Sequence, residues 1–192
     1  MIKRYTLISI LFSLIIFACT QQEKKKSDLQ FSINENLLGL TFQDTMSHLT
    51  LRIPKGWLPL SSFDSATQTK FNSLKDEIGF QDVFIDSLQQ GGSLMIKSLI
   101  NIDTVAIGNM YRDPETAFNQ QKVWNQIMKS SFYYNDLLIK QFLLQNNDLV
   151  SFKLIISEGL SHPIQLDYIL SRNTYMLEVK KIESSIGSIN SL

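Results

Sequence analysis

The chain has 192 residues with 18 basic and 18 acidic side chains, so it carries no net formal charge at pH 7. This balance excludes the basic excess that is typical of nucleic-acid-binding proteins, and it gives no electrostatic reason to expect binding to an anionic surface. The length fits one domain that can bury a sizeable core.

The N-terminus has the layout of an export signal. Lys3 and Arg4 provide a positive start, and a mainly apolar segment follows at residues 7–18. This segment is shorter than the roughly 20 apolar residues that a membrane-spanning helix needs. Residues 16–19, Ile-Phe-Ala-Cys, resemble the lipobox of bacterial lipoproteins. The resemblance implies that residues 1–18 are a removed signal peptide and that Cys19 carries diacylglycerol or palmitate chains.

Two other interpretations of the cysteine remain. An ordinary secretory signal could precede an incidental Cys19, and a reactive thiol would need neighbours that lower its pKa, although the nearest cations are Lys24 to Lys26. The succession of charge, apolar segment, small Ala18 and cysteine favours the lipid anchor, even though Phe17 is bulkier than the usual residue. Two or three acyl chains hold a protein stably on a membrane. Because Thr20 is not the aspartate associated with inner-membrane retention, an outer-membrane location is favoured in a bacterium with two membranes.

Residues 19–34 are predicted to be the lipidated cysteine and a flexible tether, because the stretch TQQEKKKSDLQ has almost no apolar content. Its lysines at 24–26 are interpreted as part of a solvated spacer, with lipid headgroups as the alternative contact. The lone cysteine leaves no internal disulfide, so the fold must be stable without one. Residues 35–192 are then one domain.

Alternation and turn residues predict the first elements of this domain. Extended segments at 38–43 and 48–53 are separated by polar residues and form a hairpin that ends at Pro54-Lys55-Gly56. The stretch SFDSATQTKFNSLKDEIG predicts a helix, with Asp64 or Ser65 as the N-cap and Gly79 at the end. Further extended segments are expected at 82–87 and 93–102.

A second helix is expected after Asp113-Pro114-Glu115, since this sequence pairs an N-cap carboxylate with a proline at the first helical position. Helical spacing of apolar residues extends this helix to about Ser130. The last third predicts an antiparallel meander, with period-two faces at 138–144, 150–156 and 164–170 and a fourth strand at Tyr175–Lys180. Because alternate positions are also partly apolar, helices are expected on both sheet faces.

The order of these elements, with the phrases Ile53-Pro54-Lys55-Gly56-Trp57 and Ser184-Ser185-Ile186, resembles PsbP/Mog1-like proteins, including PsbP-like bacterial lipoproteins. The resemblance covers roughly residues 37–189. It implies an α+β fold, an α/β/α sandwich with a central, mainly antiparallel β-sheet. Members of this group are mostly associated with binding and assembly, which implies an adaptor rather than an enzyme. Some PsbP proteins bind metal ions, but no ligands can be matched in this chain.

Motifs that carry chemistry are scarce. The chain lacks a glycine-rich phosphate loop, a His-Glu-x-x-His motif, a Gly-x-Ser-x-Gly motif and a cysteine pair. Asp44 and His48 could share a metal only if their turn were helical, whereas the surrounding alternation predicts extended chain. We therefore expect neither a metal site nor a cofactor.

Ser161, His162 and Asp167 follow one another in an order that resembles a hydrolase triad. Adjacent serine and histidine residues in a turn rarely point at each other, so a polar turn ended by Pro163 is the favoured interpretation. No residue is expected to be catalytic. A small hydrolase with a site near His162 remains an alternative function.

Four residues are candidates for contacts with a partner or a pocket. Trp57 follows a Pro-Lys-Gly turn and is expected either in the core or in a pocket wall, with the core favoured. Tyr111, Arg112 and Trp124 lie around the predicted second helix and could contact a partner, although core packing explains Trp124 equally well. The sequence thus predicts a non-enzymatic, lipid-anchored envelope protein that serves as an adaptor for an unidentified protein. A small-molecule carrier with a pocket between sheet and helix is the alternative.

Overall fold

The computed structural model describes residues 31–88 and 91–192. The predicted signal peptide, Cys19 and most of the predicted tether therefore lie outside the described residues. In the described ranges, no helix is both long and apolar enough to cross a membrane. Two antiparallel sheets and several short helices make up the fold.

The small sheet has the strand order β1-β2-β10, with bounds Leu38–Asp44, Leu49–Pro54 and Asn190–Ser191. The large sheet has the order β3-β4-β5-β9-β8-β7-β6, with bounds Trp57–Pro59, Asp82–Asp86, Ser93–Ser98, Ile164–Ser171, Leu149–Glu158, Leu137–Gln145 and Gln126–Tyr134. The helices are η1 (Glu35–Leu37), η2 (Leu60–Ser62), α2 (Ser65–Ile78), α3 (Thr104–Arg112), α4 (Pro114–Phe118) and α5 (Tyr175–Gly187).

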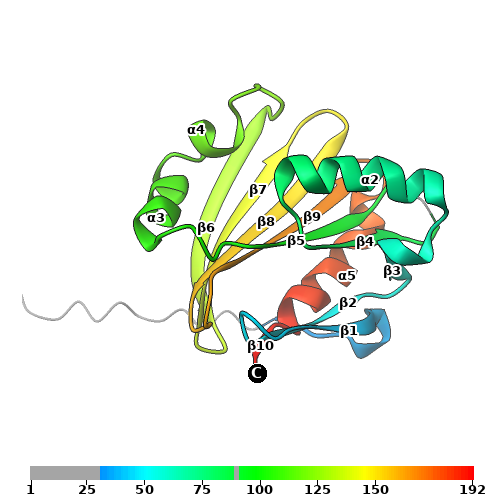
Figure 1. Cartoon of the computed structure of the whole chain (residues 1–192), viewed down its shortest axis with the longest axis horizontal. Helices are drawn as coiled ribbons and strands as arrows, with labels where there is room; N and C mark the ends of the chain where they lie inside the picture. Colours follow the sequence, from blue (N-terminus) through cyan, green and yellow to red (C-terminus); the bar gives the residue numbers. More distant parts are fainter. Residues whose placement is uncertain (1–30, 89–90) are drawn as a thin grey trace, which may run out of the picture.

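Helices and the small sheet cover the two faces of the large sheet (Figure 1). Helices α2, α3 and α4 lie on one face, while α5 and the strands β1, β2 and β10 lie on the other. The main apolar cluster fills the space between the large sheet, the small sheet and α5. Two smaller clusters lie beneath α3–α4 and beneath α2. The fold is therefore α+β, with a central antiparallel sheet between helical layers, as predicted.

The predicted N-terminal hairpin is confirmed as β1 and β2. At the turn, one Asp44 carboxylate oxygen accepts a hydrogen bond from the Met46 amide at 3.1 Å, and His48 takes a φ of 55°. This geometry reverses the chain because a short side-chain acceptor can satisfy the turn amides locally. Leu49 and Leu51 of β2 then point into the main cluster, where they are fully buried.

The predicted first helix is also confirmed, as α2. The Asp64 carboxylate accepts from the Thr67 amide at 3.0 Å and from the Thr67 hydroxyl at 3.2 Å, which satisfies the start of the helix. Gly79, with a φ of 77°, follows its last residue. Extended segments are found as β4 and β5, although β5 ends at Ser98 because the chain turns away to reach the Asp103 cap of α3.

The second predicted helix is wrong beyond its first turn and a half. Asp113 caps α4 as expected, but the helix ends at Phe118 and residues 126–134 form strand β6. The Asn119 side chain donates to the Trp124 carbonyl at 2.9 Å and accepts from the Trp124 amide at 2.8 Å, which closes a loop where the helix was expected. The β6 ladder pairs nine residues with β7 across the Asn135-Asp136 turn, so hairpin pairing overrides the local helical spacing.

The meander is confirmed for β7, β8 and β9, but the predicted fourth strand at Tyr175–Lys180 is wrong because this segment begins helix α5. Met176 and Leu177 of this segment are exposed, so they do not form the buried face that a strand of the meander would need. Ile182 and Ile186, one helical turn apart, are the residues that α5 buries in the main cluster. Strand β9 pairs with β5 instead.

Candidate functional site

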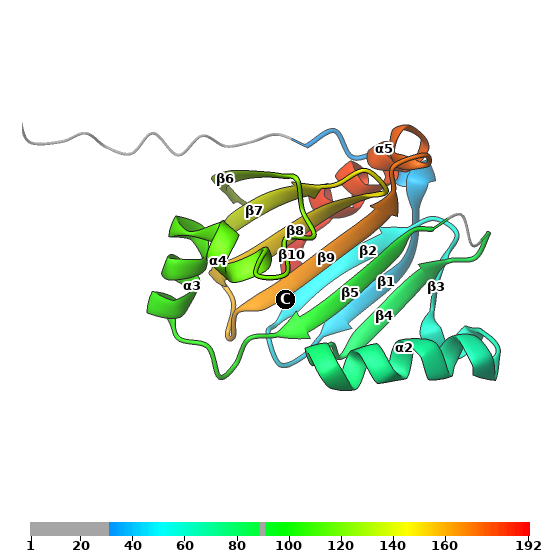
Figure 2. The same cartoon turned by 90° about the horizontal axis from the view of Figure 1, so that it is seen from above.

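A groove opens on the face of the large sheet that carries α2 at one end and α3–α4 at the other. Figure 2 shows these two groups of helices apart, with β5, β9 and β8 between them. A cavity of about 220 Å³ lies in this region. Its apolar walls come from Phe80, Met95, Phe118, Trp124, Leu144 and Ile169, and its polar lining from Ser151, Lys153 and Asp167.

Strand register explains why these side chains meet. Met95 of β5 lies opposite Asp167 of β9, and Asp167 lies opposite Lys153 of β8. In the neighbouring row, Ile169 is opposite Ser151 and Ser151 is opposite Leu144. Residues directly opposite each other and two apart along a strand share one face of a sheet. The groove floor is therefore built from two cross-strand rows of the meander.

Lys153 and Asp167 form an ion pair at the groove. The exposed fraction of the side chain is 11% for Lys153 and 5% for Asp167, so both charges are largely removed from water. The same Asp167 oxygen, Oδ2, also accepts a 3.0 Å hydrogen bond from the Gln165 amide group. The other oxygen, Oδ1, is buried and receives no hydrogen bond from a described residue. Desolvated pairs are stable only when their geometry and additional hydrogen bonds offset the desolvation cost.

Aromatic residues form the wall on the α4 side. The Phe118 ring packs edge-on against Phe142, with ring centroids 4.9 Å apart, and the Lys153 ammonium lies 5.1 Å from the Phe118 centroid. The latter distance allows a cation–π interaction. The main-chain amide and carbonyl of Trp124 are both hydrogen bonded to the Asn119 side chain, which fixes the Trp124 backbone. The wall is thus held in place by its own packing and capping interactions.

Three of the four candidate contact residues lie on the α3–α4 side of the molecule. Trp124 lines the groove, and the Tyr111 ring packs against Phe142 with centroids 5.8 Å apart. Arg112 is exposed beside it. The Lys129 ammonium donates to the carbonyls of Tyr111 and Arg112 at 2.9 and 3.0 Å, which ties the end of α3 to strand β6.

Trp57 lies apart from these residues, in the main cluster on the opposite face of the sheet. Only 1% of its surface is exposed, and its ring packs near Tyr168 at a centroid distance of 6.3 Å. Gly92 lies so close that a Cβ atom there would come within 2.7 Å of the indole. The structure therefore gives Trp57 the core position that the sequence favoured over a pocket wall.

The residues of the possible hydrolase triad are not assembled with one another. The Ser161 hydroxyl is hydrogen bonded to Nδ1 of His48 rather than to its neighbour His162. Asp167 is paired with Lys153 in the groove. The Asp44 carboxylate accepts a hydrogen bond from the Met46 amide within its own turn. Among residues 31–88 and 91–192, no group of three metal-binding side chains is found.

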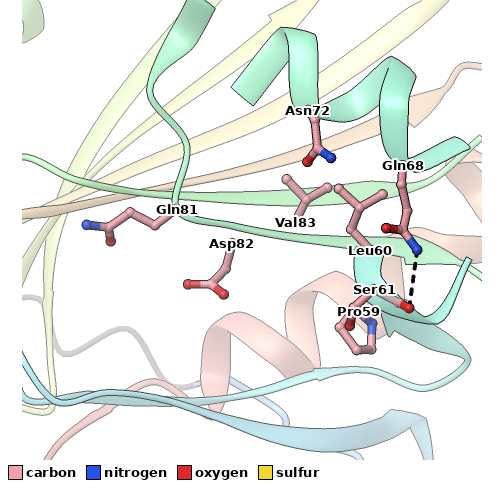
Figure 3. A pocket seen from close by; sticks show the side chains of 8 residues that line it. All are labelled: Pro59, Leu60, Ser61, Gln68, Asn72, Gln81, Asp82 and Val83. Carbon is pink, nitrogen blue, oxygen red and sulfur yellow. Dashed lines mark hydrogen bonds between the residues drawn. The ribbon is translucent and has the colours of Figure 1, made fainter. Parts of the chain in front are cut away.

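Another cavity, of about 230 Å³, lies between η2, α2 and the start of β4 (Figure 3). Its lining residues are Pro59, Leu60, Ser61, Gln68, Asn72, Gln81, Asp82 and Val83. Figure 3 shows the Gln68 amide directed at the Ser61 carbonyl, a contact of 3.4 Å. Its polar residues Asn72, Gln81 and Asp82 are exposed and Gln68 is half-buried, whereas the groove contains a buried ion pair, so we regard the groove as the stronger candidate site.

No family model matches the chain, and no curated protein matches its sequence. A similar solved structure is the solution structure of cyanobacterial PsbP (CyanoP) from Synechocystis sp. PCC 6803. It has a TM-score of 0.52 and 11% identity, and the alignment covers 84% of this chain and 98% of that chain. A Pseudomonas aeruginosa protein of unknown function, titled a putative regulator, aligns over 78% of this chain and 94% of its own at 7% identity, but its TM-score of 0.36 is too low to inform the fold. The chain therefore has a PsbP-like fold.

Proposed function

We propose that the protein is a non-enzymatic lipoprotein of the bacterial cell envelope and that it acts as an adaptor for another envelope protein. The layout of residues 1–19 supports the location, with acyl chains on Cys19 as the anchor and the outer membrane as the favoured site in a bacterium with two membranes. The observation that carries the adaptor role is the exposed edge strand β6.

Strand β6 is a long strand at the edge of the large sheet. Natural proteins usually protect such edge strands against pairing with other chains. It pairs with β7 over nine residues, and no described strand pairs with its other side. Edge strands are commonly protected by proline, by several charges or by being short. The sequence of β6, QIMKSSFYY, contains no proline and a single charged residue, Lys129. An extended segment of a partner could therefore add to this edge by main-chain hydrogen bonds.

The surroundings of β6 suit such a partner. The candidate contact residues Tyr111 and Arg112 are held beside the strand by Lys129, and Trp124 lies two residues before it. Met128, on the strand itself, is 45% exposed. Aromatic, arginine and methionine side chains are enriched at protein interfaces. We infer that the main chain of β6 provides affinity and that these side chains provide selectivity.

Proline substitution at two neighbouring positions tests this proposal. In an antiparallel edge strand, consecutive amides point alternately to the partner strand and outward. Among Ser130→Pro and Ser131→Pro, one variant should therefore lose a β6–β7 hydrogen bond, while the other should lose only an outward donor. Thermal unfolding identifies the second variant as the one with the higher Tm.

The partner is then sought by chemical cross-linking in intact native cells, affinity capture and mass spectrometry. A stoichiometric envelope protein captured by the wild-type chain should be lost with the outward proline variant, although that variant remains folded and anchored. A Cys19→Ala chain controls for neighbours that depend only on location. Capture that is unchanged by the outward proline would contradict strand addition. A second copy of this chain as the only captured species would show self-association instead of an adaptor.

The groove favours a second candidate function, a small-molecule carrier. It lies between the sheet and α4, and it combines apolar walls with a few buried polar groups. Ligand sites commonly have this composition. A ligand that co-purifies with the protein and is detected by native mass spectrometry would support this function, and the site can be tested independently of β6.

A further inference from the structure

Asp167 is the unusual group of the groove. Its Oδ2 atom accepts from both Lys153 and Gln165, whereas Oδ1 is buried and receives no hydrogen bond from a described residue. Buried polar atoms in folded proteins are nearly always hydrogen bonded, because an unpaired one has lost its solvation without replacement. Asp167 lines the groove, and its Oδ1 atom is an acceptor without a donor among the described residues.

The walls restrict what kind of molecule could bring that donor. Phe118 and Trp124 are aromatic, and Met95, Leu144 and Ile169 are aliphatic or thioether side chains, so the body of a ligand would be apolar. Flat rings pack well against aromatic faces and edges. A cavity of about 220 Å³ is smaller than the sites of drug-sized ligands, and one or two fused rings suit it.

The charges of the groove argue for a neutral ligand. The Lys153 ammonium is already paired with Asp167 and faces the Phe118 ring, so the two buried charges compensate each other. An anionic ligand would meet the unpaired oxygen of Asp167, and a cationic ligand would meet the Lys153 ammonium. Either would also lose its hydration in an apolar cavity, which is costly for an ion. A neutral N–H or O–H group avoids these costs.

We propose that the groove binds neutral, flat, mainly apolar molecules that donate one hydrogen bond to Oδ1 of Asp167, with indole as the simplest probe. This site requires neither the lipid anchor nor strand β6, so it is separate from the adaptor role. It gives the carrier function a ligand class. The donor is the discriminating feature, because the apolar walls alone would accept many ring compounds of the same size.

The two tryptophans of the chain provide a built-in control. Trp124 lines the groove, and Trp57 is buried on the opposite face of the sheet. The test uses the full chain, labelled with ¹⁵N and purified in detergent, and follows the two side-chain N–H signals while indole is added. The Trp124 signal should shift saturably and the Trp57 signal should stay in place. Equal shifts of both signals, or no shift of the Trp124 signal up to the solubility limit of indole, would overturn the proposal.

Benzofuran is the matched ligand, since it has the size and shape of indole but an oxygen in place of the N–H group. It should bind at least about tenfold more weakly, because Oδ1 gains no donor. The two affinities are compared at the free concentration of each compound, because indole and benzofuran partition differently into micelles. Equal affinity of indole and benzofuran would contradict the role of Asp167.

A variant that fills the groove tests the location without disturbing the ion pair. Ser151→Ile adds a β-branched side chain to the groove floor, in a strand that tolerates such residues. The folded variant should lose the indole-dependent shift of Trp124. If the variant fails to fold, the ratio of indole to benzofuran affinity still decides the proposal. A folded Ser151→Ile chain that binds indole with unchanged affinity would place the ligand elsewhere and overturn it.

Discussion

At the scale of single residues, the Lys153–Asp167 pair combines the desolvation cost of two buried charges with the gain from their attraction. The two contributions can be measured separately. Both side chains are nearly buried, and Asp167 is further hydrogen bonded by Gln165. Removing one member of such a pair leaves the other charge desolvated and unpaired, whereas replacing both with apolar groups is often neutral or stabilising. The intact pair is therefore expected to contribute little to the free energy of unfolding, whereas the loss of one partner should lower it strongly.

Lys153→Met should lower the free energy of unfolding by about 3–5 kcal/mol, because the Asp167 carboxylate would stay buried without its partner. The double variant Lys153→Met/Asp167→Leu should recover most of this loss. Urea-induced unfolding measures both changes. Lys140→Met is a matched control, since Lys140 lies on the same sheet face, 6.0 Å from the Tyr111 ring centroid, and should change stability by less than about 1 kcal/mol. Equal loss in the single and double variants would show that the two charges are not coupled.

Some of these residue positions could be predicted and others could not. Trp124 and Trp57 are conspicuous because of their size, and the sequence allowed a core position for both, with a pocket wall as the alternative for Trp57 and a partner contact for Trp124. Lys153 was visible only as a polar residue inside the apolar strand SFKLIIS, and Asp167, inside IQLDYIL, was considered only as a member of a possible hydrolase triad. Their pairing depends on the register between β8 and β9, which no local pattern specifies. The groove could therefore not be assembled from the sequence.

At the scale of elements, the helix caps connect sequence to stability most directly. The pKa of the Asp64 carboxyl is held below its usual value of 3.8 by the hydrogen bond from the Thr67 amide and then by that from the Thr67 hydroxyl. A lowered pKa in the folded state means that the ionised form is preferentially stabilised by folding. This contribution is complete above the unfolded-state pKa and is lost as the pH falls through the folded-state value.

Asp64→Ala should therefore lower the Tm at neutral pH, and the difference from the wild-type Tm should shrink as the pH is lowered below about 4. Asp64→Asn keeps a capping oxygen without the titrating charge, so its Tm at neutral pH should lie nearer to that of the wild type. Thermal unfolding followed by circular dichroism between pH 7 and pH 2 measures these changes. A Tm difference between wild type and Asp64→Ala that stays constant over this range would contradict the charged-cap interpretation.

Element type was predictable where a local signal agreed with the long-range packing. The β1–β2 hairpin, α2 and strands β7 to β9 have turn residues, caps or strict alternation that match their final environment. The prediction failed at β6 and at the start of α5. At β6 the nine-residue ladder with β7 decided the structure, and at α5 the packing of Ile182 and Ile186 in the main cluster favours a helix, with Met176 and Leu177 exposed. The pairing that decides β6 is with the next strand across a two-residue turn, whereas the contacts that α5 makes in the main cluster are distant in sequence.

At the scale of the whole molecule, the position of the N-terminal segment relates the domain to its proposed anchor. The Phe31 ring packs against Tyr134 at 4.9 Å and Phe132 at 5.8 Å between centroids, so the described chain begins beside the end of β6. Even fully extended, the chain between Cys19 and Phe31 spans at most about 40 Å. An anchor at Cys19 would therefore keep the end of β6 within about 40 Å of the membrane surface, and the rest of the strand within that distance plus the width of the domain. An envelope partner would meet the strand in this region.

The anchor itself is the remaining prediction, and intact-mass spectrometry of membrane-extracted protein tests it. The wild-type chain should lack residues 1–18 and carry the added mass of a diacylglycerol on Cys19. Cys19→Ala should carry no lipid, because alanine has no thiol to which the diacylglycerol could be attached. Thr20→Ala is the matched control, since it alters the adjacent residue and keeps the thiol, and it should be processed like the wild type. A wild-type chain that is cleaved elsewhere or lacks the lipid mass would contradict the lipobox interpretation. Without that lipid, no anchor would hold the domain and its β6 edge at the membrane surface.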